Sequence, residues 1–239
     1  MAIKAITFDF WSTLFRDTDT IGARRKLRVD AFVEATGVSC ELAEEAHQVT
    51  ARAFLKHHIE RQQTLGPMDC VRMMADHCGV TIDAGTAERL ADVVAHAILA
   101  FPPVPIEGAL EAVRAAAAVA PVALISDTGH SPGSALARIM EAEGFRSYFR
   151  TLVFSDEVGV SKPQAPMFYA AAQALGVLPS ELLHIGDLEP TDIAGAHGVG
   201  AKAALFSGFN DRFAGNHTAH FHFASWGEFV DALPGIVHG

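Results

Sequence analysis

The sequence has little cysteine, little positive charge and no long run of uncharged apolar residues. Its 239 residues include three cysteines, an odd number without the spacing of metal ligands (Cys40, Cys70 and Cys78). So few cysteines in this arrangement indicate reduced thiols in a cytoplasmic protein, and no disulfide framework is expected. We interpret the cysteines as ordinary core or surface residues.

Basic residues are outnumbered by acidic ones. The chain has 18 lysines and arginines against 28 aspartates and glutamates, which gives a formal net charge of −10. Nucleic acids and anionic membranes recruit basic surfaces, so neither is expected as a partner. A small anionic substrate is compatible with this charge, because it needs only a local positive pocket. We expect a monomer or a homodimer.

No stretch reaches the roughly 18 uncharged apolar residues that a membrane-spanning helix needs. The apolar run at the N-terminus contains Lys4 and Asp9, and it does not have the pattern of a signal peptide. The sequence therefore predicts a soluble, cytoplasmic protein.

Half of the residues are hydrophobic, enough for a sizeable core with an insertion. From residue 17 to residue 101 the pattern is helical, with breaks at Gly37, Gly66-Pro67 and Gly79. Helices are expected over residues 21–36, 39–63, 68–78 and 86–100. Three prolines, at positions 102, 103 and 105, then predict a stiff linker. Residues 1–16 and 102–239 are thus expected to form one domain, and residues 17–101 an inserted helical domain.

The remaining sequence alternates between strand-like and helix-like segments. Apolar runs lead directly into Asp9, Ser126 and Asp187, and helical segments separate the runs after residue 107. This alternation predicts right-handed crossovers and a parallel sheet, an α/β fold. Strand ends of such a sheet meet at one edge, so these three side chains should gather there with Lys162, which lies on a loop. On its own, Asp9 could equally cap the turn that follows its strand.

These segments resemble the four motifs of the haloacid dehalogenase superfamily of hydrolases. The sequence from Asp9 to Leu14, DFWSTL, is similar to the first motif, DxDxTL. Ser126 at a strand end corresponds to the second motif, Lys162-Pro163 to the third, and Gly186-Asp187 through Asp192 to the acidic fourth. The resemblance covers most of the chain. It implies a Rossmann-like α/β core with an inserted helical cap of the C1 type.

The resemblance also implies roles for these residues. Asp9 would be a nucleophile that forms a covalent intermediate, as a carboxylate at a strand tip can, and Ser126 and Lys162 would assist it. Thr13, Ser126, Asp127 and Lys162 would bind the substrate. Magnesium prefers oxygen ligands and keeps several waters. Its expected ligands are Asp9, the backbone carbonyl of Trp11, Asp187 and Asp192.

Two positions depart from the family pattern. Phosphatases of the family have a second aspartate where this chain has Trp11. That aspartate protonates the leaving group and then activates water, which an indole cannot do. Dehalogenating relatives have an aromatic residue there. The second departure is Asp127, where an asparagine often follows the serine.

Three functions therefore remain open. The first is a magnesium-dependent phosphohydrolase acting through an aspartyl phosphate on Asp9, with a proton donor borrowed from Asp17, Asp19 or a histidine of the cap. The second is a metal-independent 2-haloacid dehalogenase, favoured by Trp11. The third is a binding or regulatory protein with weak catalysis. A basic cluster (Arg24, Arg25, Lys26 and Arg28) is either a solvated helix face or a contact for an anionic substrate.

Overall fold

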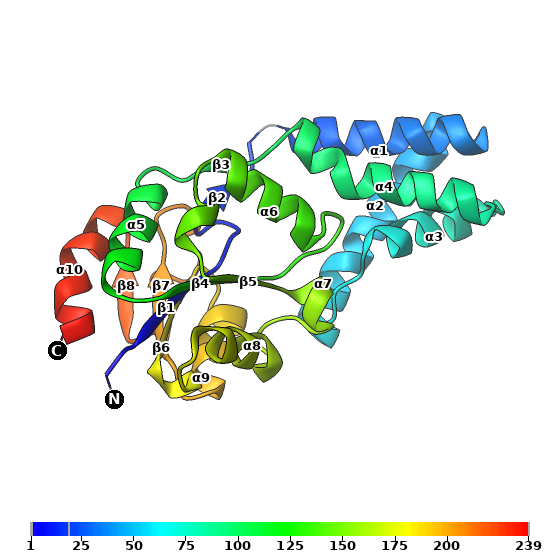
Figure 1. Cartoon of the computed structure of the whole chain (residues 1–239). Coiled ribbons are helices and arrows are strands. Elements are labelled where there is room, and N and C mark those ends of the chain that lie inside the picture. The colour runs from blue at the N-terminus through cyan, green and yellow to red at the C-terminus, as the bar shows by residue number, and fades with distance from the viewer. Residues whose placement is uncertain (1, 19, 239) are drawn as a thin grey trace.

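Six parallel strands form the central sheet of the protein (Figure 1). The computed structural model describes residues 2–18 and 20–238. The strand order is β5-β4-β1-β6-β7-β8, so the N-terminal strand lies in the interior of the sheet. The predicted α/β fold class is confirmed. The strands are β1 (Ala5–Phe8), β4 (Val122–Ser126), β5 (Thr151–Phe154), β6 (Leu182–Gly186), β7 (Lys202–Phe206) and β8 (Phe221–Phe223).

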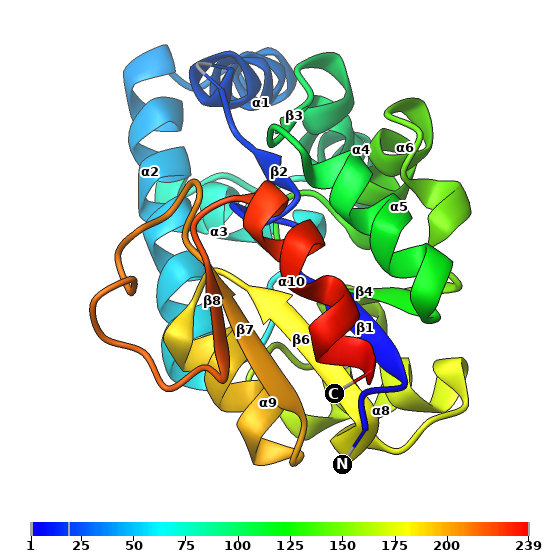
Figure 2. The ribbon, with the colours of Figure 1, turned by 90° about the vertical axis from the view of Figure 1, so that its left-hand side faces the viewer.

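Helices cover both faces of the sheet, as Figures 1 and 2 show. Alternate residues of β1 point to opposite faces, so Ile6 and Phe8 join one hydrophobic cluster and Ala5 joins the other. On the Phe8 face lie α5 (Ala109–Val119), α6 (Gly133–Ala142) and α10 (Trp226–His238). On the Ala5 face lie α8 (Ala165–Leu175) and α9 (Ala194–Gly198). Burial on both faces explains the continuous apolar runs in the strand sequences.

Short helical turns complete this part of the chain. They are α7 (Ser155–Val158), the 3-10 turns η2 (Arg146–Tyr148) and η3 (Pro179–Glu181), and the π turn η4 (Glu189–Ile193).

The inserted segment forms its own helical layer with a separate hydrophobic cluster, which includes Val29, Phe32, Met74 and Leu90. Its helices are α1 (Ile21–Thr36), α2 (Cys40–Lys56), α3 (Pro67–Cys78) and α4 (Ala84–Ala100). Glycines in the left-handed conformation end α1 and α3, at Gly37 and Gly79, as the sequence pattern predicted.

The second helix of this layer ends earlier than the predicted residue 63. After Lys56 the chain continues as a π turn, η1 (His57–Arg61), and Gln62 then adopts a left-handed conformation. The carbonyl of Gln62 accepts hydrogen bonds from the backbone N–H of Ser161 and from Nε2 of Gln164. These bonds hold the end of the helix on the loop that carries Lys162, a tertiary contact that local sequence cannot reveal.

Two short strands connect the helical layer with the sheet. β2 (Phe15–Arg16) pairs in antiparallel fashion with β3 (Val104–Pro105). Arg24 links the two connecting segments through hydrogen bonds. Its Nε donates to the carbonyl of Phe101 at 2.7 Å, and its Nη2 donates to Oδ1 of Asp17 at 2.5 Å. Both ends of the insertion are therefore held together beside the sheet.

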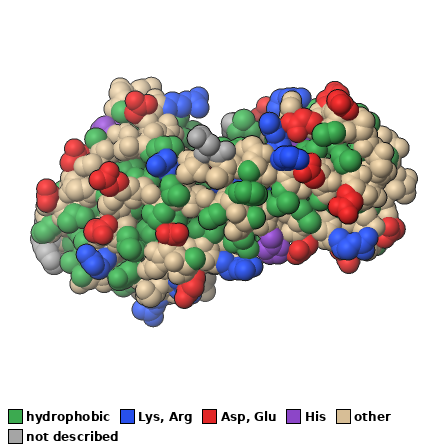
Figure 3. Space-filling model, turned by 90° about the horizontal axis from the view of Figure 1, so that it is seen from above, with side chains coloured by type: hydrophobic (Ala, Val, Ile, Leu, Met, Phe, Trp, Pro, Cys, Tyr) green, Lys and Arg blue, Asp and Glu red, His purple; other side chains and the backbone are tan. Residues whose placement is uncertain are grey.

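On the face seen from above, acidic and basic side chains are interspersed (Figure 3). In the part of the chain that the structure describes, no helix is long and apolar enough to cross a membrane.

Candidate active site

The polar residues predicted at the strand ends meet in one pocket. Asp9 follows β1, Asp187 follows β6, and Lys162 lies on the loop after β5 and α7. The pocket has a volume of about 140 Å³. Its lining residues are Asp9, Trp11, Ser12, His58, Asp127, Lys162, Asp187, Leu188, Thr191 and Asp192.

Lys162 is the central cation of the pocket and is 2% exposed. Its Nζ donates to Oδ1 of Asp9 at 2.5 Å, to Oδ1 of Asp192 at 2.6 Å and to the carbonyl of Ile125 at 3.1 Å. Burial alone would lower the pKa of Lys162, but the negative charges of Asp192 and Asp9 outweigh burial and raise it. The ammonium therefore stays charged and holds the two carboxylates in place.

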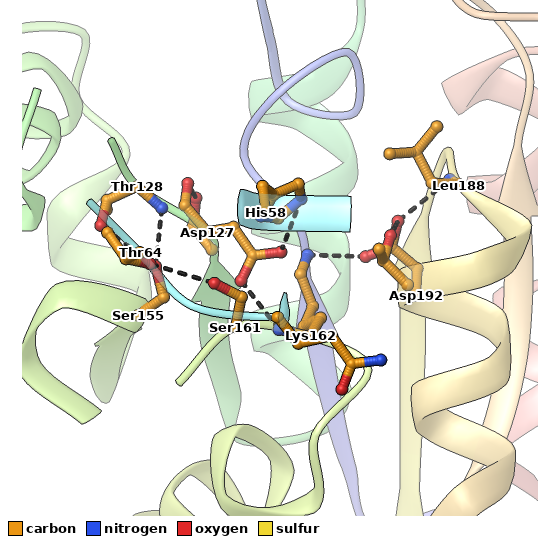
Figure 4. Close-up of polar contacts among 12 residues, drawn as sticks. His58, Thr64, Asp127, Thr128, Ser155, Ser161, Lys162, Leu188 and Asp192 are labelled. Atoms are coloured by element: carbon orange, nitrogen blue, oxygen red, sulfur yellow. Dashed lines mark hydrogen bonds and ion pairs between the residues drawn. The ribbon is translucent and has the colours of Figure 1, made fainter. Parts of the chain in front are cut away.

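Asp192 is oriented by donors from several elements. Its Oδ1 accepts from Lys162 and lies 3.1 Å from Nε2 of His184, while its Oδ2 accepts from the backbone N–H of Leu188 at 3.0 Å (Figure 4). Burial raises the pKa of Asp192, but Lys162 and His184 outweigh burial and hold it below its usual range. A Cβ at Gly186 would lie 2.2 Å from Cγ of Asp192, so the approach of this carboxylate requires glycine at that position.

His184 is a buried partner that the sequence analysis missed. It lies within β6, and its Nδ1 is 2.9 Å from Oγ1 of Thr7 on the neighbouring strand β1. The carboxylate of Asp192 can only accept a hydrogen bond, so Nε2 of His184 donates to it. Nδ1 of the neutral ring then accepts from the hydroxyl of Thr7. A histidine inside the apolar run LLHIG was the available signal, because a buried polar side chain needs a partner.

Asp187 and Asp9 are also electrostatically unusual. Burial and the charge of Asp192 raise the pKa of Asp187 to about 7, although Oδ2 of Asp187 accepts a 2.6 Å hydrogen bond from Asn210. Burial also raises the pKa of Asp9, against the opposing charge of Lys162. Among the described residues, the pocket is thus lined by one lysine and four aspartates, Asp9, Asp127, Asp187 and Asp192.

The carboxylates of the pocket offer the oxygen ligands that a magnesium ion prefers. Within residues 2–18 and 20–238, no group of three or more Asp, Glu, His or Cys side chains is arranged to hold a metal ion by itself. Magnesium needs only one or two carboxylates, because it keeps several water ligands. Asp9 and Asp187 fit that need, whereas both oxygens of Asp192 already accept hydrogen bonds from the protein.

Ser126 and Thr13 lie beside the pocket but are not among its lining residues. The hydroxyl of Ser126 donates to the carbonyl of Asp127 at 3.2 Å, and the side chains of Ser126 and Thr13 are buried. Within the described ranges, Oγ1 of Thr13 is buried without a hydrogen-bond partner. Asp127 does face the pocket, and its Oδ1 accepts from the backbone N–H of Lys162 at 2.9 Å.

The helical layer contributes His58 to the pocket. His58 lies on η1, and its Nε2 is 3.7 Å from Oδ2 of Asp127 (Figure 4). Nearby, Oγ1 of Thr64 lies 2.5 Å from Oγ of Ser155 and 3.0 Å from Oγ of Ser161. A histidine of this layer was expected as a candidate proton donor, but no local motif in the sequence marks His58.

The basic cluster divides into two pairs. Arg25 pairs with Glu44 at 3.0 Å and Lys26 with Asp30 at 2.6 Å, both at the surface. Arg24 and Arg28 are instead buried and line a larger cavity of about 420 Å³. This cavity shares Trp11, His58 and Asp127 with the smaller pocket. Of the two alternatives, the solvated face therefore applies to Arg25 and Lys26 but not to Arg24 and Arg28.

Comparison with known proteins identifies the family. Residues 3–200 match the family model described as haloacid dehalogenase-like hydrolase, and the chain belongs to that family.

Several phosphatases are among its relatives in sequence. The chain is 42% identical over 57 residues to a glyceraldehyde 3-phosphate phosphatase of Methanopyrus kandleri, which is 24% of each protein. It is 37% identical over 98 residues to a pyrimidine 5′-nucleotidase of Escherichia coli, 40% of this chain and 42% of the relative. The matches thus span less than half of these relatives.

Solved structures with the same fold include both kinds of hydrolase. A phosphatase of the family from Thermococcus onnurineus has a TM-score of 0.70 at 19% identity, and the match covers 98% of this chain and 99% of the other. An L-2-haloacid dehalogenase from Xanthobacter autotrophicus has a TM-score of 0.60 at 17% identity, with the same coverage. At these identities the likeness concerns the fold alone.

Proposed function

We propose that the protein is a magnesium-dependent phosphohydrolase that acts on a small phosphorylated metabolite through an aspartyl phosphate on Asp9. The observation that carries this proposal is the gathering of Asp9, Asp187 and Asp192 around the single ammonium of Lys162. Such a pocket would repel an anionic substrate unless a cation were bound with it. The phosphatases among the sequence relatives support the same reaction class.

The reaction would proceed in two displacements. A carboxylate oxygen of Asp9 attacks phosphorus, the bond from phosphorus to the leaving oxygen breaks, and that oxygen receives a proton. Water then attacks phosphorus, which releases phosphate and restores the Asp9 carboxylate. Lys162, 2.5 Å from Asp9, holds the nucleophile in position. Magnesium, held by Asp9, the carbonyl of Trp11 and Asp187, would supply positive charge to the phosphoryl oxygens, while Asp192 orients Lys162.

His58 would supply the proton that Trp11 cannot give. It lines the same pocket as Asp9, and its Nε2 lies 3.7 Å from Oδ2 of Asp127. Asp17 is less suited to this role because its carboxylate pairs with Arg24 at 2.5 Å. Asp19, the other acidic candidate, lies outside the described residues. Asp127 would position the ring of His58 through this contact.

Residues 17–101 would act as a cap over the core formed by residues 1–16 and 102–239. The cap brings His58 to the pocket and contacts the core through Thr64, Ser155 and Ser161. The paired strands β2 and β3 would be the hinge about which it opens.

A metal-independent 2-haloacid dehalogenase is the second candidate. Trp11 favours it, because a halide leaves without a proton, and so does the buried Arg28, which suits a substrate carboxylate. Asp187 and Asp192 oppose it, because a metal-independent displacement has no use for two further negative charges beside an anionic substrate.

Substitution of the nucleophile tests the proposal. Asp9→Asn keeps the shape of the side chain but removes its nucleophilic oxygen, so phosphate release from aryl phosphates should fall to below about one per cent of wild type. Asp211→Asn, at an exposed position, is the matched control and should retain full activity. Circular dichroism of both variants checks that the fold is intact. Activity of Asp9→Asn near that of wild type would exclude Asp9 as the nucleophile.

A further inference from the structure

The larger cavity adjoins the pocket of Asp9 and extends beneath the helical layer. Its volume is about 420 Å³, and it shares Trp11, His58 and Asp127 with the pocket. Apolar side chains form much of its wall, including Phe54 and Ile98. A substrate whose phosphoryl group lies at Asp9 would therefore place the rest of its structure in this cavity.

Arg28 lines the cavity with donors that the protein leaves unused. The residue is 9% exposed. Among the described residues, the one hydrogen bond of its side chain runs from Nε to the carbonyl of Val94 at 3.3 Å. The N–H groups of its two terminal nitrogens therefore have no acceptor in the described part of the chain. Burial lowers the pKa of Arg28 to about 10, so the guanidinium remains charged at neutral pH.

Two histidines beside Arg28 have equally unused ring nitrogens. In the described part of the chain, Nε2 of His130 and both ring nitrogens of His47 are buried without a hydrogen-bond partner. The ring of His130 stacks on Phe54 at 4.1 Å and lies 5.7 Å from that of His47. Burial and the charge of Arg28 lower the pKa of His130 to about 3 and that of His47 to about 4. The two histidines therefore lie close to Arg28 and are neutral.

Acidic side chains near this cluster are already paired. Asp17 binds Arg24 and Glu44 binds Arg25. A polar nitrogen without a hydrogen-bond partner inside a protein is unfavourable, and a charge without a partner is more so. An anion at Arg28 and His130 would give both side chains a partner. A carboxylate suits the site because its two oxygens match the parallel donors of a guanidinium.

We propose that Arg28 and His130, with His47 behind them, form a second anion subsite that binds a carboxylate of the substrate. The inference rests on the proposed phosphohydrolase activity and narrows its substrates to phosphomonoesters that also carry a carboxylate. The apolar middle of such a substrate would pack against Trp11 and Phe54, between the two charged ends.

Paired substrates test this subsite. The phosphate esters of 2-, 3- and 4-hydroxybenzoate carry a carboxylate at three different distances, and the corresponding hydroxybenzamide phosphates are their neutral counterparts. In magnesium, at least one carboxylate ester should exceed its amide by about tenfold or more in kcat/KM. Arg28→Gln should remove this preference. Arg25→Gln, an exposed position on the same helix, should leave it unchanged.

Equal use of acids and amides by wild type at all three positions would overturn the subsite, as would a preference that survives Arg28→Gln. If Arg28→Gln does not fold, His130→Asn replaces it and should weaken the preference. Calorimetry with 4-carboxybenzylphosphonate and its amide measures the same discrimination without turnover. If no ester releases phosphate, the proposed function is overturned but the subsite is not. Tighter binding of 4-carboxybenzylphosphonate than of its amide would then still support the subsite.

Discussion

At the scale of single residues, the main chemical problem is the leaving group. An alkoxide leaves slowly unless it is protonated, and Trp11 occupies the position from which family phosphatases deliver that proton. His58 reaches the same pocket from the helical layer, and Oδ2 of its partner Asp127 lies 3.7 Å from its Nε2. The proton donor would thus have moved from the core to the cap.

This assignment predicts how rate depends on the leaving group. Wild type should show a shallow slope of log kcat/KM against leaving-group pKa, because His58 protonates poor leaving groups. His58→Gln should steepen the slope, with a loss of about 10²- to 10⁴-fold for alkyl phosphates and little loss for acyl phosphates. Trp11→Asp in the same background should restore part of the loss, since it returns a carboxylate to the usual position.

His57→Gln is the control, because the preceding histidine bonds within its own helix, to the carbonyl of Ala53, and does not line the pocket. Equally shallow slopes of log kcat/KM against leaving-group pKa in wild type and His58→Gln would show that another group supplies the proton. A steep slope already in wild type would show that no group supplies it.

At the scale of elements, α2 and the loop after β4 meet through two histidines, of which His47 is buried and His130 half-buried. His47 lies on α2 and His130 on the loop. Both have a pKa below the ordinary value of 6.5, because burial and Arg28 disfavour their charged forms. Below about pH 6.5 the unfolded chain binds protons at these positions and the folded protein does not. The stability they contribute is therefore complete above that pH and is lost as the pH falls toward 4 and then 3.

Urea unfolding measures this effect. Between pH 7.5 and pH 5.0, wild type should lose about 1–2 kcal/mol more free energy of unfolding than His130→Phe, since phenylalanine takes up no proton. Comparison of the two proteins cancels the contributions of Asp9, Asp127 and Asp187, whose raised pKa values act in the opposite direction. His96→Asn, at an exposed position, should behave as wild type. Identical pH dependence of wild type and His130→Phe would contradict the prediction.

Sequence periodicity was sufficient to predict most elements. The helix over residues 21–36 matches α1, and the apolar runs ending at Ser126 and Asp187 match β4 and β6, because burial on both sheet faces imposes continuous apolar segments. The segment 57–63 was predicted as part of the same helix as α2. Residues 57–61 are helical but form a π turn, and the helix ends before the left-handed Gln62. The carbonyl of Gln62 accepts hydrogen bonds from the loop of Lys162, which is a contact between distant parts of the chain.

The same limit applies to the site. The proximity of residues at strand ends could be predicted from the sequence alone, because the ends of parallel strands lie at one edge of the sheet. Asp9 and Asp187 lie in one pocket for this reason. His58, His184 and Arg28 come from a helix, a strand interior and a helix face, and only packing decides that they face a pocket. Ser126 and Thr13 were predicted to bind the substrate; both are buried, and neither is among the residues that line the pocket.

At the scale of the whole molecule, the sheet and the helical layer contribute different residues to the pocket of Asp9 and the adjoining cavity. The sheet positions the acidic residues and Lys162, and the helical layer adds His58 and the donors of Arg28. β2, β3 and Arg24 hold the two connections between the layers together. Chemistry at Asp9 and selection of the substrate would thus depend on separate parts that meet at one cavity.

Removal of divalent cations tests the magnesium-dependent role of Asp9 most directly. Wild-type protein is assayed in parallel for phosphate release from a panel of phosphate esters and for halide release from 2-chloropropionate, first in magnesium and then in excess EDTA. We predict that phosphate release falls by about a hundredfold or more in EDTA and returns when magnesium is restored, with no halide released in either condition. Undiminished halide release in EDTA, without phosphate release in magnesium, would contradict the phosphohydrolase function and establish the dehalogenase.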